Sequence, residues 1–311
     1  MAQTWPNITN LNGPANFNTG ANQHNNQGNR GRLIENQGKY NENNFGNGTP
    51  DLPGDVKVAF DEHFCPAVIE FVGCSKNAWN TPTSKELETI WVKVMPDPFK
   101  DQFSEFEPTI RKLVTEVLVS WRDSIASKAV ETLAKVFYDQ KLKSGSEKQK
   151  TYIREQTSGE YWKRAYYFPP GSKTTNGVPT GVFQSMIVSQ TFSAHFEAIQ
   201  SIPEDQRLKA HPVEALILTI LAIERAFAIS IEGGESNSHG KFIPTGHKVK
   251  PEELRAIFGK NQRGVDRISV GLWSNIIAAA KAHLEVNVGI SGAMGIGKQG
   301  ENKELPPDLV Y

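Results

Sequence analysis

A glycine-rich string near the C-terminus comes closest to a motif with known chemistry. Gly292 to Gln299 reads GAMGIGKQ, the spacing of a phosphate-binding loop, except that Gln299 stands where a serine or threonine would hold magnesium. Such a loop also needs a helix after it, because the N-terminal dipole of that helix completes the anion site. The sequel, ENKELPPDLVY, does not provide that helix. We therefore expect a flexible tail here rather than a nucleotide site, and we expect no cofactor.

Metal ligands and nucleophiles are sparse. His63, Cys65 and Cys74 carry metal-binding atoms, yet neither paired CxxC knuckles nor an HExxH helix occurs. We expect two buried thiols that pack as small hydrophobes, and no metal site. Ser238 stands beside His239 in a predicted loop, where nothing would orient a base. No GxSxG elbow occurs either, so no catalytic residue is assigned.

Glu224, followed by Arg225, interrupts an otherwise apolar segment. A carboxylate in a helix that is apolar on most faces must be paired, hydrogen-bonded or protonated. We expect a structural partner such as an arginine, because ion-pair networks also create buried acids. General-base chemistry at Glu224 is the alternative.

A run of cations is interleaved with aromatic residues between positions 141 and 167. Cations beside stacking rings are what a platform for single-stranded nucleic acid uses. The alternative is a solvated helix face followed by aromatic residues that enter the core, since nearby glutamates dilute the charge. The cations are Lys141, Lys143, Lys148, Lys150, Arg154, Lys163 and Arg164. The aromatic residues are Tyr152, Tyr161, Trp162, Tyr166 and Tyr167.

The composition of the chain changes sharply near Pro53. Residues 1–53 are dominated by Asn and Gly, and they cannot bury enough apolar surface to offset their backbone entropy. We expect a disordered, flexible tail, with a prion-like assembling segment as the alternative. Lys+Arg and Asp+Glu both number 34, so the formal net charge is zero and no whole-chain field attracts nucleic acid or membrane.

The sequence carries no sign of export or of a membrane anchor. Residues 1–6 show no basic region leading into an apolar one, and no apolar run reaches the length of a bilayer span. Two cysteines fit a reducing compartment. We expect an intracellular protein, cytoplasmic or nuclear, that does not bind membranes.

Residues 54–98 are predicted to form an apolar lead-in segment packed on the core. Alternation over 56–60 and β-branched residues up to Val72 favour one or two short strands, or an irregular segment. Thr83 and Glu86 have the spacing of a capping box, which opens a short helix that the next prolines stop.

Residues 99–288 are predicted to form one multi-helix domain. Pro108 stands where the first turn of a long amphipathic helix would begin, and apolar residues follow it at steps of three and four. Pro212 precedes a segment that is apolar in nearly every direction, which we expect to be the central helix. Further helices are predicted over 146–157, 183–192, 251–258 and 265–286. Residues 289–311 are predicted to be a flexible tail.

The helical region resembles a domain of unknown function that is abundant in mushroom-forming basidiomycete fungi. The resemblance covers Phe99 to about Leu284 and rests on FSEFEPTIRKLV opening a long helix, on SAHFEAI followed by IP, and on HPVEALILTILAIERAFAI. The loop from Gly233 to Lys241 before a last pair of helices adds to it. The resemblance implies an all-helical core, and it brings no catalytic residue or activity with it.

The sequence thus predicts a mainly α protein with three functions open. The first is a non-enzymatic helical module that binds a protein partner or self-associates, since no catalytic constellation accompanies the predicted core. The second is nucleic-acid binding through residues 141–167. The third is an enzyme with an unfamiliar site near Glu224. The sequence does not identify a small-molecule ligand.

Overall fold

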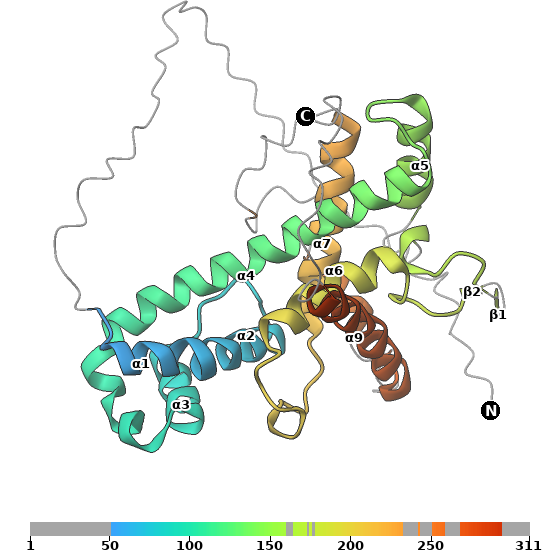
Figure 1. Ribbon diagram of the computed structural model, residues 1–311. Coiled ribbons are helices and arrows are strands. Elements are labelled where there is room, and N and C mark those ends of the chain that lie inside the picture. The colour runs from blue at the N-terminus through green and yellow to red at the C-terminus, as the bar shows by residue number, and fades with distance from the viewer. Residues whose placement is uncertain are drawn as a thin grey trace, which may run out of the picture. The chain divides into compact units, whose positions relative to one another are not determined.

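The computed structural model describes residues 51–159, 164–172, 174–175, 178–232, 242, 251–258 and 268–293, with 174–175, 178–179, 232 and 285–293 as backbone only. The chain divides into two units, Met1–Thr49 and Pro50–Tyr311, and every described residue belongs to the second. This unit is mainly helical, which confirms the predicted fold class (Figure 1). The tail predicted over 1–53 lies outside the described residues except for 51–53.

The lead-in segment is helical, so the prediction of short strands there was wrong. It comprises α1 (Gly54–Ala59), a π-helical turn (Phe60–Phe64) and α2 (Cys65–Gly73). The most deeply buried side chains of this segment are spaced four residues apart, slightly more than one α-helical turn of about 3.6 residues. The wider π-helical turn helps to keep them on one face. Val58, part of the alternation that favoured a strand, is 55% exposed. The most deeply buried apolar side chains instead recur at every fourth position: Val56, Phe60, Phe64, Val68 and Val72.

The next helix, α3 (Ser84–Val94), begins at the predicted capping box. The Thr83 hydroxyl accepts a hydrogen bond from the Glu86 amide, and the Glu86 carboxylate accepts one from the Thr83 amide. This reciprocal pair satisfies two of the amide groups that a helix start leaves without partners.

The long helix α4 (Phe103–Asp139) follows a 3-10 turn (Asp97–Gln102). The prediction that Pro108 opens this helix was wrong, because the helix begins at Phe103 and Pro108 lies inside it. A proline has no amide hydrogen, so the carbonyl of Ser104 loses its usual intrahelical donor. Figure 1 shows α4 running along α1, α2 and α3 at one end and reaching α5 at the other.

Shorter elements connect α4 to the core helices. The helix α5 (Glu147–Thr157) is confirmed, and a 3-10 turn (Ala165–Tyr167) follows it. A small antiparallel pair follows this turn, β1 (Thr174–Thr175) and β2 (Val178–Pro179).

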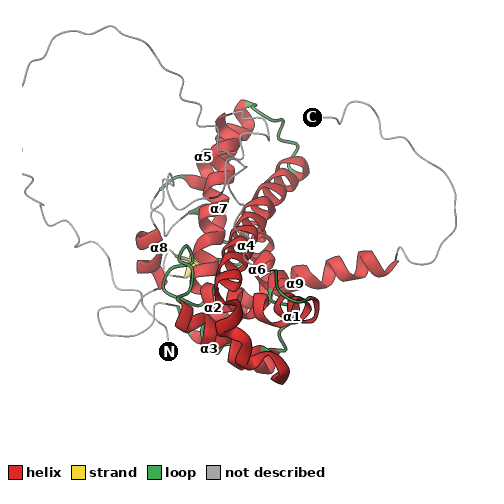
Figure 2. Ribbon diagram, turned by 90° about the vertical axis from the view of Figure 1, so that its left-hand side faces the viewer, coloured by secondary structure: helices red, strands yellow, loops and turns green. Residues whose placement is uncertain are grey.

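The remaining helices are α6 (Met186–Ala198), α7 (Val213–Glu232), α8 (Pro251–Phe258) and α9 (Val270–Ala293). The helix α7 contacts α2, α4, α5, α6 and α8, which confirms that it is central. Figure 2 shows the far end of α9 extending away from the other helices. The helix continues to Ala293, past the start of the tail predicted from 289. Among the described residues, no helix combines the length and apolar character needed to cross a bilayer.

Candidate functional site: a pocket around a buried histidine

The predicted nucleic-acid platform is only partly on the surface. Lys141, Lys143 and Lys148 are exposed, but two predicted stacking rings, Tyr166 and Tyr167, are fully buried in the core. These two rings are therefore not available to bases.

The other platform residues are engaged elsewhere or are not described. Lys150 pairs with Glu147 at 3.1 Å, and Arg154 lies 4.0 Å from the same carboxylate. The ring of Tyr152 packs edge-on against Phe137. Tyr161, Trp162 and Lys163 lie outside the described residues. Nucleic-acid binding by the exposed lysines stays a prediction.

Glu224 has the arginine partner that its sequence context leads one to expect. Arg164 Nε lies 3.5 Å from Glu224 Oε1, and the two side chains are only 12% and 13% exposed. The hydroxyl of Tyr166 donates a hydrogen bond of 2.8 Å to the same oxygen. Burial, together with the neighbouring Tyr167 and Glu224, raises the pKa of Tyr166. Arg225 lies over the ring of Phe242, 5.8 Å from its centroid. These contacts give Glu224 a structural role.

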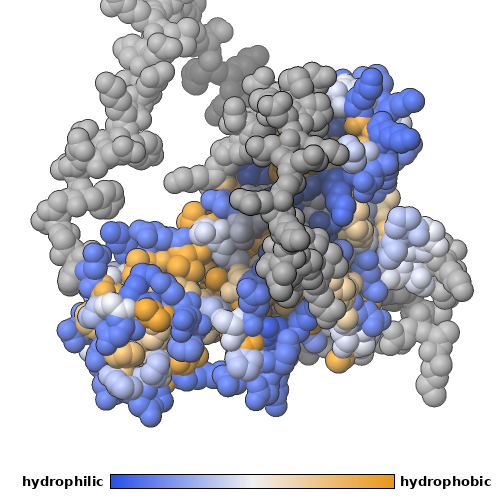
Figure 3. All heavy atoms as spheres, viewed as in Figure 1, coloured by the Kyte–Doolittle hydropathy of each residue, from blue (hydrophilic) through white to orange (hydrophobic). Residues whose placement is uncertain are grey.

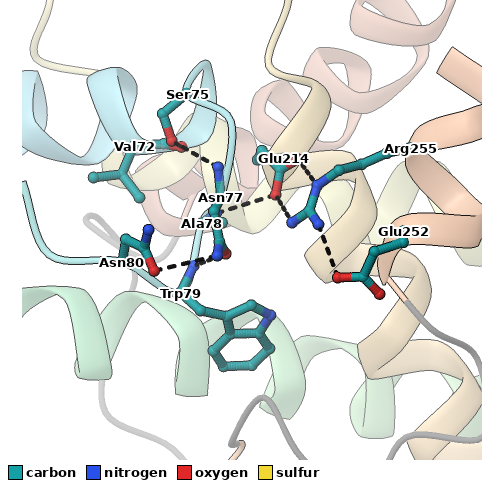
Figure 4. Close-up of polar contacts among 9 residues, drawn as sticks. All are labelled: Val72, Ser75, Asn77, Ala78, Trp79, Asn80, Glu214, Glu252 and Arg255. Carbon is teal, nitrogen blue, oxygen red and sulfur yellow. Dashed lines mark hydrogen bonds and ion pairs between the residues drawn. The ribbon is translucent and has the colours of Figure 1, made fainter. Parts of the chain in front are cut away.

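A second buried carboxylate, Glu214 at the start of α7, was missed by the sequence reasoning. It accepts two hydrogen bonds from Arg255 of α8, from Nε at 2.6 Å and from Nη2 at 2.7 Å. It also accepts one from the amide of Ala78, in the linker between α2 and α3, at 3.1 Å. Figure 4 shows how this carboxylate joins the linker to α8. Arg122 of α4 donates to the carbonyl of Ala78 from the other side.

Next to this linker, the end of α2 forms one wall of a pocket of about 430 Å³. The other walls come from α6, from the segment 199–212 and from α9. The apolar part of the lining is Phe196, Ile199, Leu208, Ala210, Pro212 and Ile277. The polar part is Glu70, Cys74, His195, Glu204, Asp205, Arg207, Lys209 and Lys281. A volume of this size is typical of sites for small organic molecules.

His195 is the unusual member of this lining. Its side chain is fully buried, and neither ring nitrogen has a hydrogen-bond partner among the described residues. Its ring stacks on Phe192 and meets Trp121 and Phe196 at centroid distances of 5.8 and 5.2 Å. Burial, helped by the charge of Arg207, lowers the pKa of His195 to about 3. The imidazole is therefore neutral at physiological pH.

The absence of a side chain at Gly73 makes room for this ring. A Cβ at position 73 would lie 2.8 Å from His195 Cε1 and 3.4 Å from Nε2. Glu70 stands one turn earlier on α2, on the same helix face as Gly73. Glu70 and His195 therefore both line the pocket at the end of α2.

Glu70 of α2 and Cys74, which directly follows α2, are hydrogen-bonded to the segment 199–212. One oxygen of Glu70 accepts from the amide of Leu208 at 3.0 Å, and the thiol of Cys74 donates to the carbonyl of Ala210 at 3.5 Å. Burial raises the pKa of Glu70. Burial also raises the pKa of Cys74 to about 12, so this thiol stays protonated and is a poor nucleophile.

The charged side chains at the mouth of the pocket compensate one another. Glu204 pairs with Arg207 at 2.9 Å and with Lys281 at 2.5 Å. The ammonium group of Lys281 also lies over the ring of Phe196. Arg207 donates two further hydrogen bonds to the carbonyls of Ile199 and Ile202.

A metal-binding cluster and a serine activated by a histidine are two arrangements that would support catalysis. In the described part of the chain, no cluster of three or more His, Cys, Asp or Glu could hold a metal ion. Ser189 Oγ lies 3.0 Å from His283 Nε2. The carbonyl oxygen of Ser185 lies 2.8 Å from the same hydroxyl and competes with the imidazole for its one proton. A serine that donates to this carbonyl is not activated by the base.

Several residues considered for chemistry lie beyond the described part. Ser238 and His239 are among them, as are residues 294–299 of the glycine-rich string. Gly292, the first glycine of that string, belongs to α9 rather than to a loop after a strand.

Comparisons with protein-family models, curated proteins and solved structures find no significant match. The resemblance to the fungal domain therefore stays a prediction.

Proposed function

We propose that the helical domain is a non-catalytic binding protein and that its ligand is a small organic molecule held in the His195 pocket. The observation that carries the proposal is His195 itself, a fully buried imidazole with no partner for either nitrogen among the described residues. A buried polar group without a hydrogen bond costs about 1–3 kcal/mol. A ligand that bonds to the imidazole would recover this free energy.

Three features support binding rather than catalysis. The His195 imidazole, with its pKa near 3, is a weak base at neutral pH. The only thiol in the described pocket lining, Cys74, stays protonated. The ionic groups at the mouth, Glu204, Arg207 and Lys281, are bound to one another.

A protein partner or self-association, the first expectation from the sequence, stays a prediction. Figure 3 shows hydrophobic residues gathered on one face of the fold, near the end of α4 that lies along α1 and α2. Among the described residues, the large apolar side chains that are individually exposed lie on six different helices. Single exposed apolar residues are normal on soluble surfaces, so they do not select a partner.

The proposal is tested by plugging the pocket from its exposed rim. Ala210 lines the pocket and is exposed, so Ala210→Trp should fill the entrance without disturbing the core. The matched control is Ala134→Trp on the exposed face of α4. Ligand-observed NMR with a collection of neutral, acidic and basic fragments would be run on all three proteins. We expect fragments that bind the unsubstituted protein and the control but not Ala210→Trp. The proposal fails if no fragment shows this pattern.

A further inference from the structure

The chemistry of the His195 pocket also indicates the class of its ligand, an inference that rests on the proposed function. The starting point is the hydrogen-bonding capacity of the imidazole. A neutral imidazole has one nitrogen that donates and one that accepts. Both nitrogens of His195 lack partners among the described residues, and both are closed to solvent, so a ligand reaches them only when the ring or a neighbouring side chain shifts. A hydroxyl group, which donates and accepts at once, can complement either nitrogen without a change of protonation.

The charges around the pocket do not favour an ionic ligand. The lining contains three cations, Arg207, Lys209 and Lys281, and three acids, Glu70, Glu204 and Asp205. Glu204 already neutralises two of the cations at short distances. An anion that pairs with Arg207 or Lys281 would have to compete with Glu204, and a cation would approach Arg207, whose charge already acts on His195. Moving an uncompensated charge from water into such a site is costly.

Glu70 supplies a second acceptor. Among the described residues, its one hydrogen-bond donor is the amide of Leu208, which bonds to Oε1, so Oε2 can accept from a ligand. Glu70 shares a helix face with Gly73, which touches the imidazole. A hydroxyl in this corner could accept from the imidazole N–H and donate to the carboxylate. A carboxylic acid in its ionised form has no proton to donate, and an ammonium group has no lone pair to accept.

The rest of the lining is suited to a hydrocarbon. Phe196, Ile199, Pro212 and Ile277 contribute apolar surface from three different segments. Burying apolar surface stabilises a complex by about 25 cal/mol per Å² of area removed from water. The pocket therefore combines an apolar wall with one polar corner.

From these observations we infer that the pocket binds an uncharged alcohol, with an apolar body against Phe196 and Ile277 and its hydroxyl group in the corner formed by His195 and Glu70.

Four eight-carbon probes with different head groups test this inference: octan-1-ol, its methyl ether, octylammonium chloride and sodium octanoate. Their affinities would be measured by isothermal titration calorimetry on the full chain. We expect octan-1-ol to bind about tenfold more tightly than each of the other three, the order of one satisfied buried hydrogen bond. The methyl ether can accept a hydrogen bond but cannot donate one. The difference in affinity between the alcohol and the ether therefore measures the bond that the hydroxyl donates, to Glu70 or to the accepting nitrogen.

Substitutions then locate the hydroxyl. His195→Phe keeps a ring of similar size and should weaken octan-1-ol and its methyl ether by similar factors of about tenfold, because the oxygen of each accepts from the imidazole N–H. If His195→Phe does not fold, as judged by circular dichroism, Glu70→Gln carries the test. It should narrow the difference between the alcohol and octanoate, because the amide carries no negative charge and can donate to the carboxylate of octanoate.

Each remaining outcome overturns the inference in a recognisable way. Preference for octylammonium or octanoate would contradict an alcohol while leaving the pocket as the binding site. Equal binding of all four probes, unchanged by His195→Phe, would show that the imidazole does not contact the head group. If no octyl probe binds but fragments are lost in Ala210→Trp, the ligand class is wrong and the proposed function holds. If no probe and no fragment binds, the proposed function itself fails.

Discussion

Two buried polar side chains, Glu214 and His195, pack against the two ends of the segment from Gly73 to Ala78. They differ in how many hydrogen bonds they make. At Ala78, Glu214 uses both carboxylate oxygens in three hydrogen bonds from Arg255 and a backbone amide. At Gly73, His195 has no partner for either nitrogen among the described residues. Only a few residues separate these two environments along the chain.

The difference separates structure from function. A fully satisfied buried network fixes the arrangement of helices, because removing any member leaves the others unpaired. An unsatisfied buried group lowers the stability of the free protein, and each one calls for an explanation, such as an ordered water, an ion or a catalytic role. The Glu214 network positions the end of α2, and the pocket at that end keeps an unused hydrogen-bonding group.

The largest effect should come from Glu214→Leu. The substitution removes the partner of a half-buried guanidinium and leaves the buried amide of Ala78 without an acceptor. We expect the free energy of unfolding to fall by about 3 kcal/mol, at the lower end for a broken buried pair because Arg255 keeps some contact with water. Urea unfolding measures this loss.

The matched control is Glu252→Gln, at the other end of the same arginine. The Glu252 side chain is 74% exposed and lies 3.4 Å from Arg255. Exposed ion pairs contribute about 0.2–1 kcal/mol, so this variant should stay within that range. Equal losses in the two variants would contradict a special role for Glu214.

Gly73→Ala should have the next largest effect. The new methyl group would meet His195 Cε1 at 2.8 Å, and the ring must move against Trp121 and Phe192. Overpacking of this kind costs about 1–3 kcal/mol, and the better helix propensity of alanine offsets part of it. Thermal unfolding should show a net loss of about 1–2 kcal/mol, with weaker binding in the pocket. Gly271→Ala, where nothing lies within 4 Å of the added carbon, should be neutral or stabilising. A stabilised Gly73→Ala would show that the ring is not confined.

His195→Phe should change how stability depends on pH. The pKa of this imidazole falls from 6.5 to about 3 on folding, so between these values the unfolded chain binds a proton that the folded one does not. Stability is therefore lost as the pH falls below about 6.5, by about 1.4 kcal/mol per pH unit. The His195→Phe variant lacks this contribution. Between pH 6 and pH 5, its free energy of unfolding should therefore fall by about 1.4 kcal/mol less than that of the unsubstituted protein. Above pH 7 the difference between the two proteins should be flat. Parallel curves throughout would mean that His195 is not buried and neutral.

The helices were largely predictable because each carries a local signal. The capping box at Thr83, the apolar steps of α4 and the almost wholly apolar α7 all correspond to observed elements. The prediction for the lead-in segment failed because two patterns are present in the sequence. One is the alternation over 56–60, and the other is the spacing of four that begins at Val56. Only packing against the other helices shows which of the two patterns is buried.

The pocket was not predictable in the same way. His195 stands in the string SAHFEAI, and nothing around it in the sequence marks it as unpartnered. Its surroundings come from α2, α4 and α9, so only the tertiary structure brings them together. Glu214 did carry a signal, since it is an acid at the start of the same apolar helix as Glu224. That signal was assigned to Glu224 alone, although Glu214 is the more deeply buried of the two.

The smallest effect is expected at the exposed lysines of the predicted nucleic-acid platform. Replacing Lys141, Lys143 and Lys148 together by glutamine should leave the free energy of unfolding within about 0.5 kcal/mol, because exposed side chains contribute little to stability. With Tyr166 and Tyr167 buried, any binding of an oligothymidylate should rest mainly on contacts to phosphate.

Fluorescence anisotropy at low salt should therefore show a loss of about threefold at most in the triple variant, with a shallower salt dependence. The control is a triple glutamine variant at exposed lysines of α3 and α4, namely Lys85, Lys93 and Lys112. A loss well beyond tenfold that is confined to the first triple would mean that a stacking surface exists after all. It would have to involve rings other than the two that the core encloses. The contrast between the satisfied carboxylate of Glu214 and the unsatisfied imidazole of His195 would then no longer account for the function of this domain.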